Sequence, residues 1–188
     1  MAAEQTRSAR AETEFVSDSA IYRRVILETV PAARRFLWLA TSDIKDLYVD
    51  TSGRCAPFLE QLSNLIAAGV SVRLIHAKEP GPLFMRDFDR YPNLARGLER
   101  LLCPRAHFKS LVADGKIAYT GSANLTGAGM GAKSAGRRNF EEGILTTDPG
   151  LVRAIMEHFD SVWMGAHCPS CRRKRFCADF HDILRGCG

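Results

Sequence analysis

Apolar positions along the chain follow two spacings, one typical of helices and the other typical of strands. Apolar residues recur at helical spacing in three segments, which span residues 20–30, 57–69 and 149–165. Short apolar or alternating runs, which are typical of strands, occupy residues 34–41, 70–77 and 139–148. Because helical and strand segments alternate, the pattern predicts an α/β fold in which helices pack against a sheet.

The middle of the chain carries weaker signals. Two short helices are predicted over residues 83–91 and 93–102. Residues 107–114 and 116–122 then have the pattern of a β-hairpin, with Asp114 and Gly115 at its turn.

Length and composition limit the number of domains that the chain can form. A chain of 188 residues, 46% of them hydrophobic, can bury one core but is too short for two ordinary domains. Residues 1–17 are predicted to be a polar, mobile lead-in, and residues 18–165 a single α/β domain. A Cys-rich, basic tail follows over residues 166–188.

Neither a membrane span nor a secretory signal is evident in this sequence. No segment reaches the roughly 18–20 uninterrupted apolar residues that a spanning helix needs, so we expect no stable membrane insertion. The first residues include acids and lack an apolar core, unlike a signal peptide. We therefore expect a cytoplasmic protein.

The charge is basic, with a net value of +5 and a pI near 9.0. From Cys168 to Gly188 there are five Lys or Arg residues and two Asp, so the tail alone contributes +3. A basic excess suits a polyanionic partner, which can be nucleic acid or anionic lipid.

Residues 107–124 carry the strongest chemical signal. They read HFKSLVADGKIAYTGSAN, which fits H-x-K-x4-D-x6-G-S-x-N without a gap. At about one in twenty per residue type, six fixed positions match by chance on the order of once in tens of millions of starts. On a strand, His107 and Lys109 project from one face, so a nucleophile stands beside a fixed positive charge. Ser122 and Asn124 can donate hydrogen bonds to phosphoryl oxygens.

This motif resembles the HKD signature of the phospholipase D superfamily, and the likeness extends over most of residues 18–164. The chain looks most similar to the small, single-motif bacterial nucleases of that superfamily. The resemblance implies a phospholipase D-like sandwich, in which a mixed sheet has helices on both faces. It also implies that His107 attacks phosphorus and that Asp114 supports the motif.

The superfamily places an acidic residue after the GSxN segment, where it hydrogen-bonds the catalytic His. Glu141 is the residue that this resemblance selects, and Glu142 is the alternative. A carboxylate that holds Nδ1–H would fix the tautomer and leave Nε2 free to attack.

Members of the superfamily use two HKD motifs, but this chain has one. His76 and Lys78 imitate the opening of the motif, yet no matching Asp or GSxN follows, so this segment is predicted to end a core strand. Single-motif members pair two chains, which implies a homodimer with a shared active site. The implied reaction has two steps, proceeds through a phosphohistidine and needs no metal.

Four cysteines in the tail suggest a structural zinc site. The proposed ligands are Cys168, Cys171, Cys177 and Cys187, with His167 and His181 as alternatives for the fourth position. An iron–sulfur cluster and uncoordinated thiols remain open. The isolated Cys55 and Cys103 are interpreted as small buried hydrophobes.

Two basic segments are candidates for binding a polyanionic substrate. In the tail, the basic residues between the cysteines are Arg172, Arg173, Lys174 and Arg175. In the Gly-rich segment after the GSxN motif, they are Lys133, Arg137 and Arg138. Phosphate contacts by such residues would favour nucleic acid.

Three functions are consistent with the sequence. The preferred one is a metal-independent nuclease that acts on DNA or RNA. A phospholipase D that hydrolyses phosphatidyl headgroups would use the same chemistry. A nucleic-acid-binding module with a vestigial active site is the third, and the intact motif argues against it.

Overall fold

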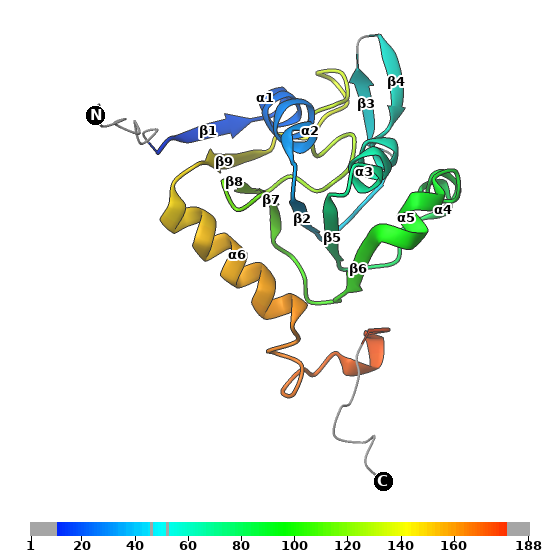
Figure 1. Cartoon of the computed structure of the whole chain (residues 1–188), viewed down its shortest axis with the longest axis vertical. Helices are drawn as coiled ribbons and strands as arrows, with labels where there is room; N and C mark the ends of the chain where they lie inside the picture. The colour runs from blue at the N-terminus through cyan, green and yellow to red at the C-terminus, as the bar shows by residue number, and fades with distance from the viewer. Residues whose placement is uncertain (1–10, 46, 52, 180–188) are drawn as a thin grey trace, which may run out of the picture.

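The computed structural model describes residues 11–45, 47–51 and 53–179. Their centre is a seven-stranded mixed sheet with the order β1-β9-β8-β7-β2-β5-β6 (Figure 1). The strands are β1 (Thr13–Ser17), β2 (Phe36–Thr41), β5 (Ser71–His76), β6 (Leu98–Leu102), β7 (Lys109–Ala113), β8 (Ile117–Gly121) and β9 (Glu142–Thr146). Strands β2, β5 and β6 are parallel, whereas β7, β8, β9 and β1 follow one another antiparallel.

Helices cover both faces of the sheet (Figure 1). One face packs against α6 (Pro149–Trp163). The other packs against a continuous helical segment and α3 (Phe58–Ala67). The helical segment consists of α1 (Ser19–Ile21), the π-helical η1 (Tyr22–Thr29) and α2 (Val30–Ala32). The predicted mixed sheet with helices on both faces is confirmed.

Strand β2 shows why its sequence is apolar without a break. Leu37 and Leu39 enter the core beneath the α1–α3 helices, while Trp38 faces α6. The Trp38 ring stacks on Phe159 of α6, with ring centroids 5.0 Å apart. Both faces of the strand are therefore buried, which selects apolar residues at every position.

The first predicted boundary is wrong in part. Residues 13–17 form β1, although they were assigned to a mobile lead-in. Their partner is β9, more than a hundred residues later, and Val16 is buried against the core. A strand this short is stabilised by pairing with its neighbour, which local sequence does not reveal. Residues 1–10 lie outside the described residues.

Residues 98–102 correct a second prediction. The expected helix over residues 93–102 is divided into α5 (Pro92–Gly97) and the parallel edge strand β6. The other short helix is present as α4 (Pro82–Asp89). A small two-stranded sheet, β3 (Tyr48–Thr51) and β4 (Arg54–Pro57), was not predicted. Pairing on β5 outweighs the helical spacing of residues 98–102.

The tail returns to the sheet after α6 and contains one short helix, η2 (Lys174–Phe176). Its contacts are with the segment that follows β6: Asp179 Oδ2 accepts from Leu102 N at 2.6 Å, and Arg173 Nη1 donates to Pro104 O at 3.0 Å. Within the described ranges, no helix has the length and apolar character that would let it span a membrane.

Candidate active site

Four strand ends meet at one end of the sheet. Lys109 opens β7 and pairs with Gly121, which closes β8, and Gly121 also pairs with Gly143 near the start of β9. The segment after β2 lies beside them, because β2 runs antiparallel to β7. His107, Ser122 and Glu141 each stand just outside one of these strand ends, so the topology gathers them at one edge.

His107 and Lys109 are held through the backbone. His107 precedes β7 and its side chain is exposed. Projection of His107 and Lys109 from one face of a strand, as expected from their spacing, therefore does not explain how they are positioned. Lys109 is only 8% exposed, and its Nζ donates to the His107 backbone O at 2.9 Å. The buried ammonium therefore fixes the main chain of His107 and supplies positive charge next to it.

Ser122 and Glu141 are joined directly. The Ser122 hydroxyl donates to the Glu141 carboxylate, and the Glu142 backbone N–H donates to Ser122 Oγ at 3.1 Å. Asn139 Nδ2 donates to the other Glu141 oxygen at 3.0 Å. Among the described residues, no hydrogen bond joins the His107 ring to Glu141 or Glu142. Orientation of His107 by a carboxylate stays a prediction.

Asn124 is anchored by its carbonyl oxygen. Oδ1 accepts from Ser42 Oγ at 2.7 Å and from the backbone N–H groups of Ser42 and Asp43, both at 3.2 Å. Because these donors occupy the oxygen, the amide Nδ2 is left as the donor that can face a substrate. The segment after β2, which sequence reasoning did not single out, thus sets the orientation of Asn124.

Asp114 lies at the opposite end of β7, in the hairpin turn. Asp114 and Gly115 both have positive φ, as the predicted turn requires. The carboxylate accepts from the backbone N–H groups of Arg34, Arg35 and Phe36, at 2.9, 2.7 and 3.0 Å. Burial raises the pKa of the Asp114 carboxyl, but these three donors outweigh burial and lower the pKa below its usual value. Asp114 therefore supports the motif by fixing the hairpin to the start of β2.

Gly121 is a glycine because other atoms of the protein pack closely against it. A Cβ there would lie 2.4 Å from the Glu142 backbone O and 2.4 Å from the Tyr119 hydroxyl. The protein itself fills this space, so the glycine permits close contact with β9 rather than with a ligand. Burial raises the pKa of the Tyr119 hydroxyl to about 12.

The Gly-rich segment is a folded loop beside the site. It leaves the sheet after Asn124, and Asn139 N donates back to Ala128 O at 3.1 Å before the chain reaches Glu141. The predicted basic residues lie on this loop; Lys133 and Arg137 are exposed and Arg138 is half-buried. Both ends of the loop meet the site, which supports a substrate-binding role.

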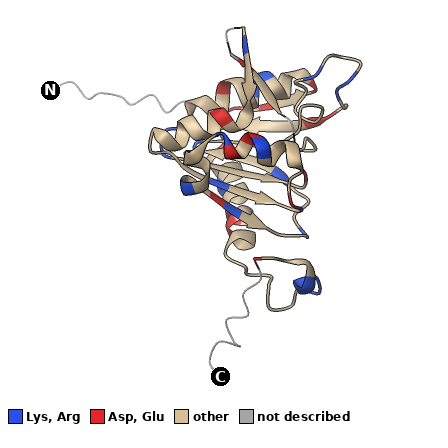
Figure 2. Cartoon of the chain, turned by 90° about the vertical axis from the view of Figure 1, so that its right-hand side faces the viewer, with Lys and Arg blue, Asp and Glu red and all other residues tan. Residues whose placement is uncertain are grey.

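The basic tail approaches the same end of the sheet. A cavity of about 420 Å³ is lined by Ser42, His107 and Arg173 together with residues 77 and 104–106. Arg172 and Arg175 are exposed, and Lys174 is half-buried. Figure 2 shows Lys and Arg gathered around the short helix of the tail, η2. Arg173 and Lys174 are thus the tail cations that line cavities with His107, and Arg172 and Arg175 lie on the surrounding surface.

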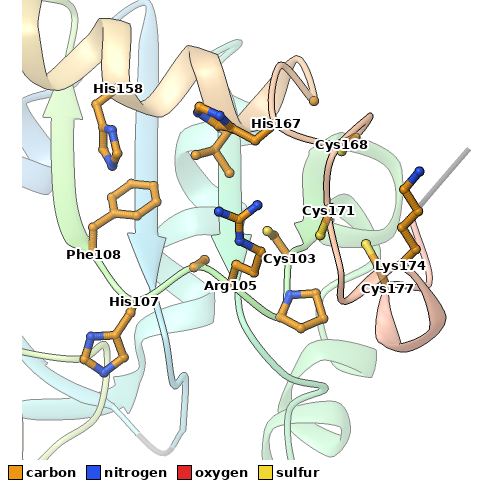
Figure 3. Close-up of a pocket in the computed structure, with 14 residues that line it drawn as sticks. Cys103, Arg105, His107, Phe108, His158, His167, Cys168, Cys171, Lys174 and Cys177 are labelled. Carbon is orange, nitrogen blue, oxygen red and sulfur yellow. The ribbon is translucent and has the colours of Figure 1, made fainter.

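Three of the four predicted metal ligands line one cavity of about 330 Å³, and Cys187 and the alternative His181 lie outside the described residues. Cys168, Cys171 and Cys177 line it, as does His167 (Figure 3). Burial raises the pKa of the Cys177 thiol, whereas the Arg173 backbone N–H lowers that of Cys171. Across the residues that the structure describes, no three or more His, Cys, Asp or Glu side chains are yet arranged as a metal site.

The two isolated cysteines do not behave alike. Cys55 is exposed on β4, which corrects the interpretation of it as a buried hydrophobe. Cys103 is half-buried and lines the same cavity as the tail cysteines. Spacing in the sequence could not reveal this, because Cys103 lies 65 residues before Cys168.

The second His-x-Lys segment is structural, as predicted. His76 is buried at the end of β5, with Nδ1 2.9 Å from the Lys78 backbone O. Lys78 forms an ion pair with Asp43, with Nζ 3.2 Å from Oδ1. Phe140 was missed: its side chain is 95% exposed next to Glu141, where an aromatic ring can stack on a base.

Several solved structures share this fold. The chain is similar to Nuc from Salmonella typhimurium, a phospholipase D family member, with 18% identity, a TM-score of 0.60, and coverage of 82% of this chain and 95% of that one. For NucT from Helicobacter pylori the identity is 14%, the TM-score 0.60, and the coverage 81% and 95%. The archaeal chromatin protein TrmBL2 matches with 14% identity and a TM-score of 0.56, over 86% of this chain and 55% of that one.

A comparison with curated protein sequences found no match. A family model does match, and it covers residues 26–163, which include every residue of the motif at the sheet end. That span is most of the chain and holds the strands that carry His107, Ser122 and Asn124. The chain belongs to the phospholipase D superfamily, through the family described as cardiolipin synthase, PLD-like domain.

Proposed function

We propose that this protein is a phosphodiesterase that cleaves nucleic acid through a covalent phosphohistidine. The observation that carries the proposal is the gathering of His107, Lys109, Ser122 and Asn124 at one end of the sheet in a member of this superfamily. Each of these side chains suits a step on a phosphodiester.

In the first step, His107 Nε2 attacks phosphorus, and the bond from phosphorus to the leaving oxygen breaks. The leaving oxygen takes a proton from His107 of the partner subunit, acting as general acid. In the second step, water attacks phosphorus and gives its proton to that same histidine. The phosphorus–nitrogen bond then breaks, and His107 is regenerated.

The other residues stabilise charge on the phosphoryl oxygens. Asn124 Nδ2 and the Lys109 ammonium are donors beside His107, and such donors are worth most where charge develops in the transition state. Ser122 is held by Glu141 and can exchange that partner for a phosphoryl oxygen.

Dimerisation is part of this proposal, because one chain supplies one motif and the reaction needs two histidines. A symmetric dimer would bring the two copies of His107 together across its axis. Light scattering at working concentration should give twice the 20.8 kDa of the chain. An active monomer would exclude the shared site.

Nucleic acid is favoured over a phospholipid by the basic surfaces around the site. Arg173 lines the cavity that contains His107, and a folded loop beside the site bears Lys133, Arg137 and Arg138. TrmBL2, which shares the fold, is described as binding DNA. The exposed Phe140 adds an aromatic surface of the kind on which single-stranded bases stack.

The test is to incubate the purified protein with labelled DNA, RNA and phosphatidylcholine vesicles, each with EDTA. Cleavage of a nucleic acid in EDTA, with a phosphohistidine trapped by acid quench, is the expected result. Release of choline instead would assign the phospholipid function. Binding of nucleic acid without cleavage of any substrate would indicate the vestigial module.

A further inference from the structure

Cys103 lies where the catalytic segment meets the tail. It follows β6 and stands four residues before His107, yet its side chain lines the cavity formed with Cys168, Cys171 and Cys177. Figure 3 shows the sulfur atoms of Cys103, Cys171 and Cys177 on the same side of the cavity, between the two segments.

Hydrogen bonds hold the tail against the segment that contains Cys103. Cys177 Sγ donates to Leu102 O at 3.3 Å, and Cys103 N donates to His76 O at 2.9 Å. Asp179 and Arg173 add contacts to Leu102 and Pro104 on either side of Cys103. The backbone around Cys103 is therefore fixed by hydrogen bonds, and the Cys103 side chain lies against the tail.

The first two tail cysteines form a turn suited to metal binding. Cys171 N donates to Cys168 O at 3.1 Å, and Arg173 N donates to Cys171 Sγ at 3.4 Å. A backbone N–H directed at sulfur stabilises a thiolate, which is the form that binds a metal. Cys177 approaches this turn from the far side of η2.

We propose that Cys103, Cys168, Cys171 and Cys177 together bind one zinc ion. Four thiolates in a tetrahedral arrangement form a closed, structural zinc site. Cys103 replaces Cys187 as the fourth ligand, so the site joins the catalytic domain to its tail and does not belong to the tail alone.

Zinc would draw together sulfur atoms that line the cavity without converging on one point. The movement falls on the tail, since residues 164–173 are turns and bends whereas the backbone on either side of Cys103 is bonded to the sheet. Arg105 lies beside Cys171 and Lys174 lines the cavity, so cations offset the negative charge of four thiolates.

The position of the site has a consequence for catalysis. Residues 103–107 connect the metal ligand to His107, and Arg173 lies two residues after Cys171. The metal would thus hold both the backbone that leads to the nucleophile and the tail cation that lines its cavity. Its role is positioning, because four thiolates leave the zinc no open position for a phosphate.

The test is the metal content of the full-length protein purified under reducing conditions with zinc present, measured by inductively coupled plasma mass spectrometry. We expect about one zinc per chain in the wild type. Cys103→Ser should weaken zinc binding by at least about 100-fold, because the loss of a ligand exceeds the cost of losing an outer partner. Cys103→His should retain zinc, since an imidazole nitrogen is also a zinc ligand.

Two matched controls define the fourth ligand. Cys55→Ser, which removes an exposed cysteine on β4, and Cys187→Ser should both keep about one zinc per chain. Retention of zinc by Cys103→Ser with loss in Cys187→Ser would overturn the proposal, as would an iron–sulfur absorption spectrum or a disulfide at Cys103. Metal content is read without substrate, so the outcome is independent of the proposed nuclease activity.

Discussion

The catalytic end of the sheet and the cysteine cavity differ in how their residues are brought together. At the sheet end, His107, Ser122 and Asn124 come from one stretch of chain, and the hairpin folds that stretch onto itself. At the cavity, Cys103 and the tail cysteines are separated by α6 and by the strands β7, β8 and β9. The first set is local in sequence, whereas the second is assembled by the fold.

This difference affects how firmly each site is held. Lys109, Asn124 and Glu141 already have hydrogen-bond partners within the domain. The tail cysteines line a cavity on a short segment without regular structure apart from η2. A site preorganised by strands can perform chemistry directly, while a site of this second kind gains order when a ligand binds.

Removal of the nucleophile should have the largest effect. His107→Asn should lower turnover by at least about 100-fold, because the change removes the nucleophile and, in a dimer, also the general acid. Steady-state hydrolysis of bis(p-nitrophenyl) phosphate measures the loss, with circular dichroism to verify folding. Glu157→Gln, an exposed residue of α6, is the control and should keep wild-type turnover. Substantial turnover in His107→Asn would contradict the covalent mechanism.

The two His-x-Lys segments can be compared through their lysines. Lys109→Ala should lower kcat/KM by about 10²–10³, the usual cost of losing a preorganised donor. Lys78→Ala removes only an exposed ion pair with Asp43 and should change kcat/KM by less than about twofold. Equal losses in both variants would mean that the second segment also takes part in catalysis.

Asp114 is expected to stabilise the fold without taking part in the reaction. Asp114→Asn should reduce the free energy of unfolding by about 1–2 kcal/mol, because three backbone N–H groups lose a charged acceptor. Turnover per folded molecule should stay near that of the wild type. Urea denaturation and active-site-normalised rates measure the two effects.

The stability difference should depend on pH. The pKa of Asp114 is lowered in the folded protein, so its stabilisation is complete above the unfolded pKa of about 3.9 and is lost as the pH falls through the folded pKa. The gap between wild type and Asp114→Asn should therefore be full at pH 7 and smaller at pH 3. Asp89→Asn, at an exposed position of α4, should show no such gap.

The smallest expected effect concerns the tail cation at the site. Arg173→Ala should weaken nucleic-acid binding several-fold and reduce the slope of log K against log salt by about 0.9, the contribution of one phosphate contact. Arg153→Ala, an exposed position on α6, serves as the control and should leave the slope unchanged. Fluorescence anisotropy at several salt concentrations measures both. An unchanged slope for Arg173→Ala would mean that this part of the tail does not contact the nucleic acid.

Much of the fold could be predicted because apolar periodicity reports burial. The run around Trp38 and the stripe on α6 both indicated buried elements correctly. The failures were β1 and β6, two edge strands, and the small β3–β4 sheet. Strands of this kind depend on a distant or adjacent partner for their hydrogen bonds, and local sequence does not specify that partner.

The sequence by itself determined which residues gather at the candidate site, because the spacing from His107 to Asn124 matches a two-strand hairpin and leaves little freedom in how those residues meet. Tertiary structure alone decided which other residues join them. It brought Ser42 to Asn124, Arg173 to His107 and Cys103 to the tail cysteines. These contacts span sheet neighbours and docked segments, and their energies depend on the packing of the whole domain, which residue spacing along the chain does not encode.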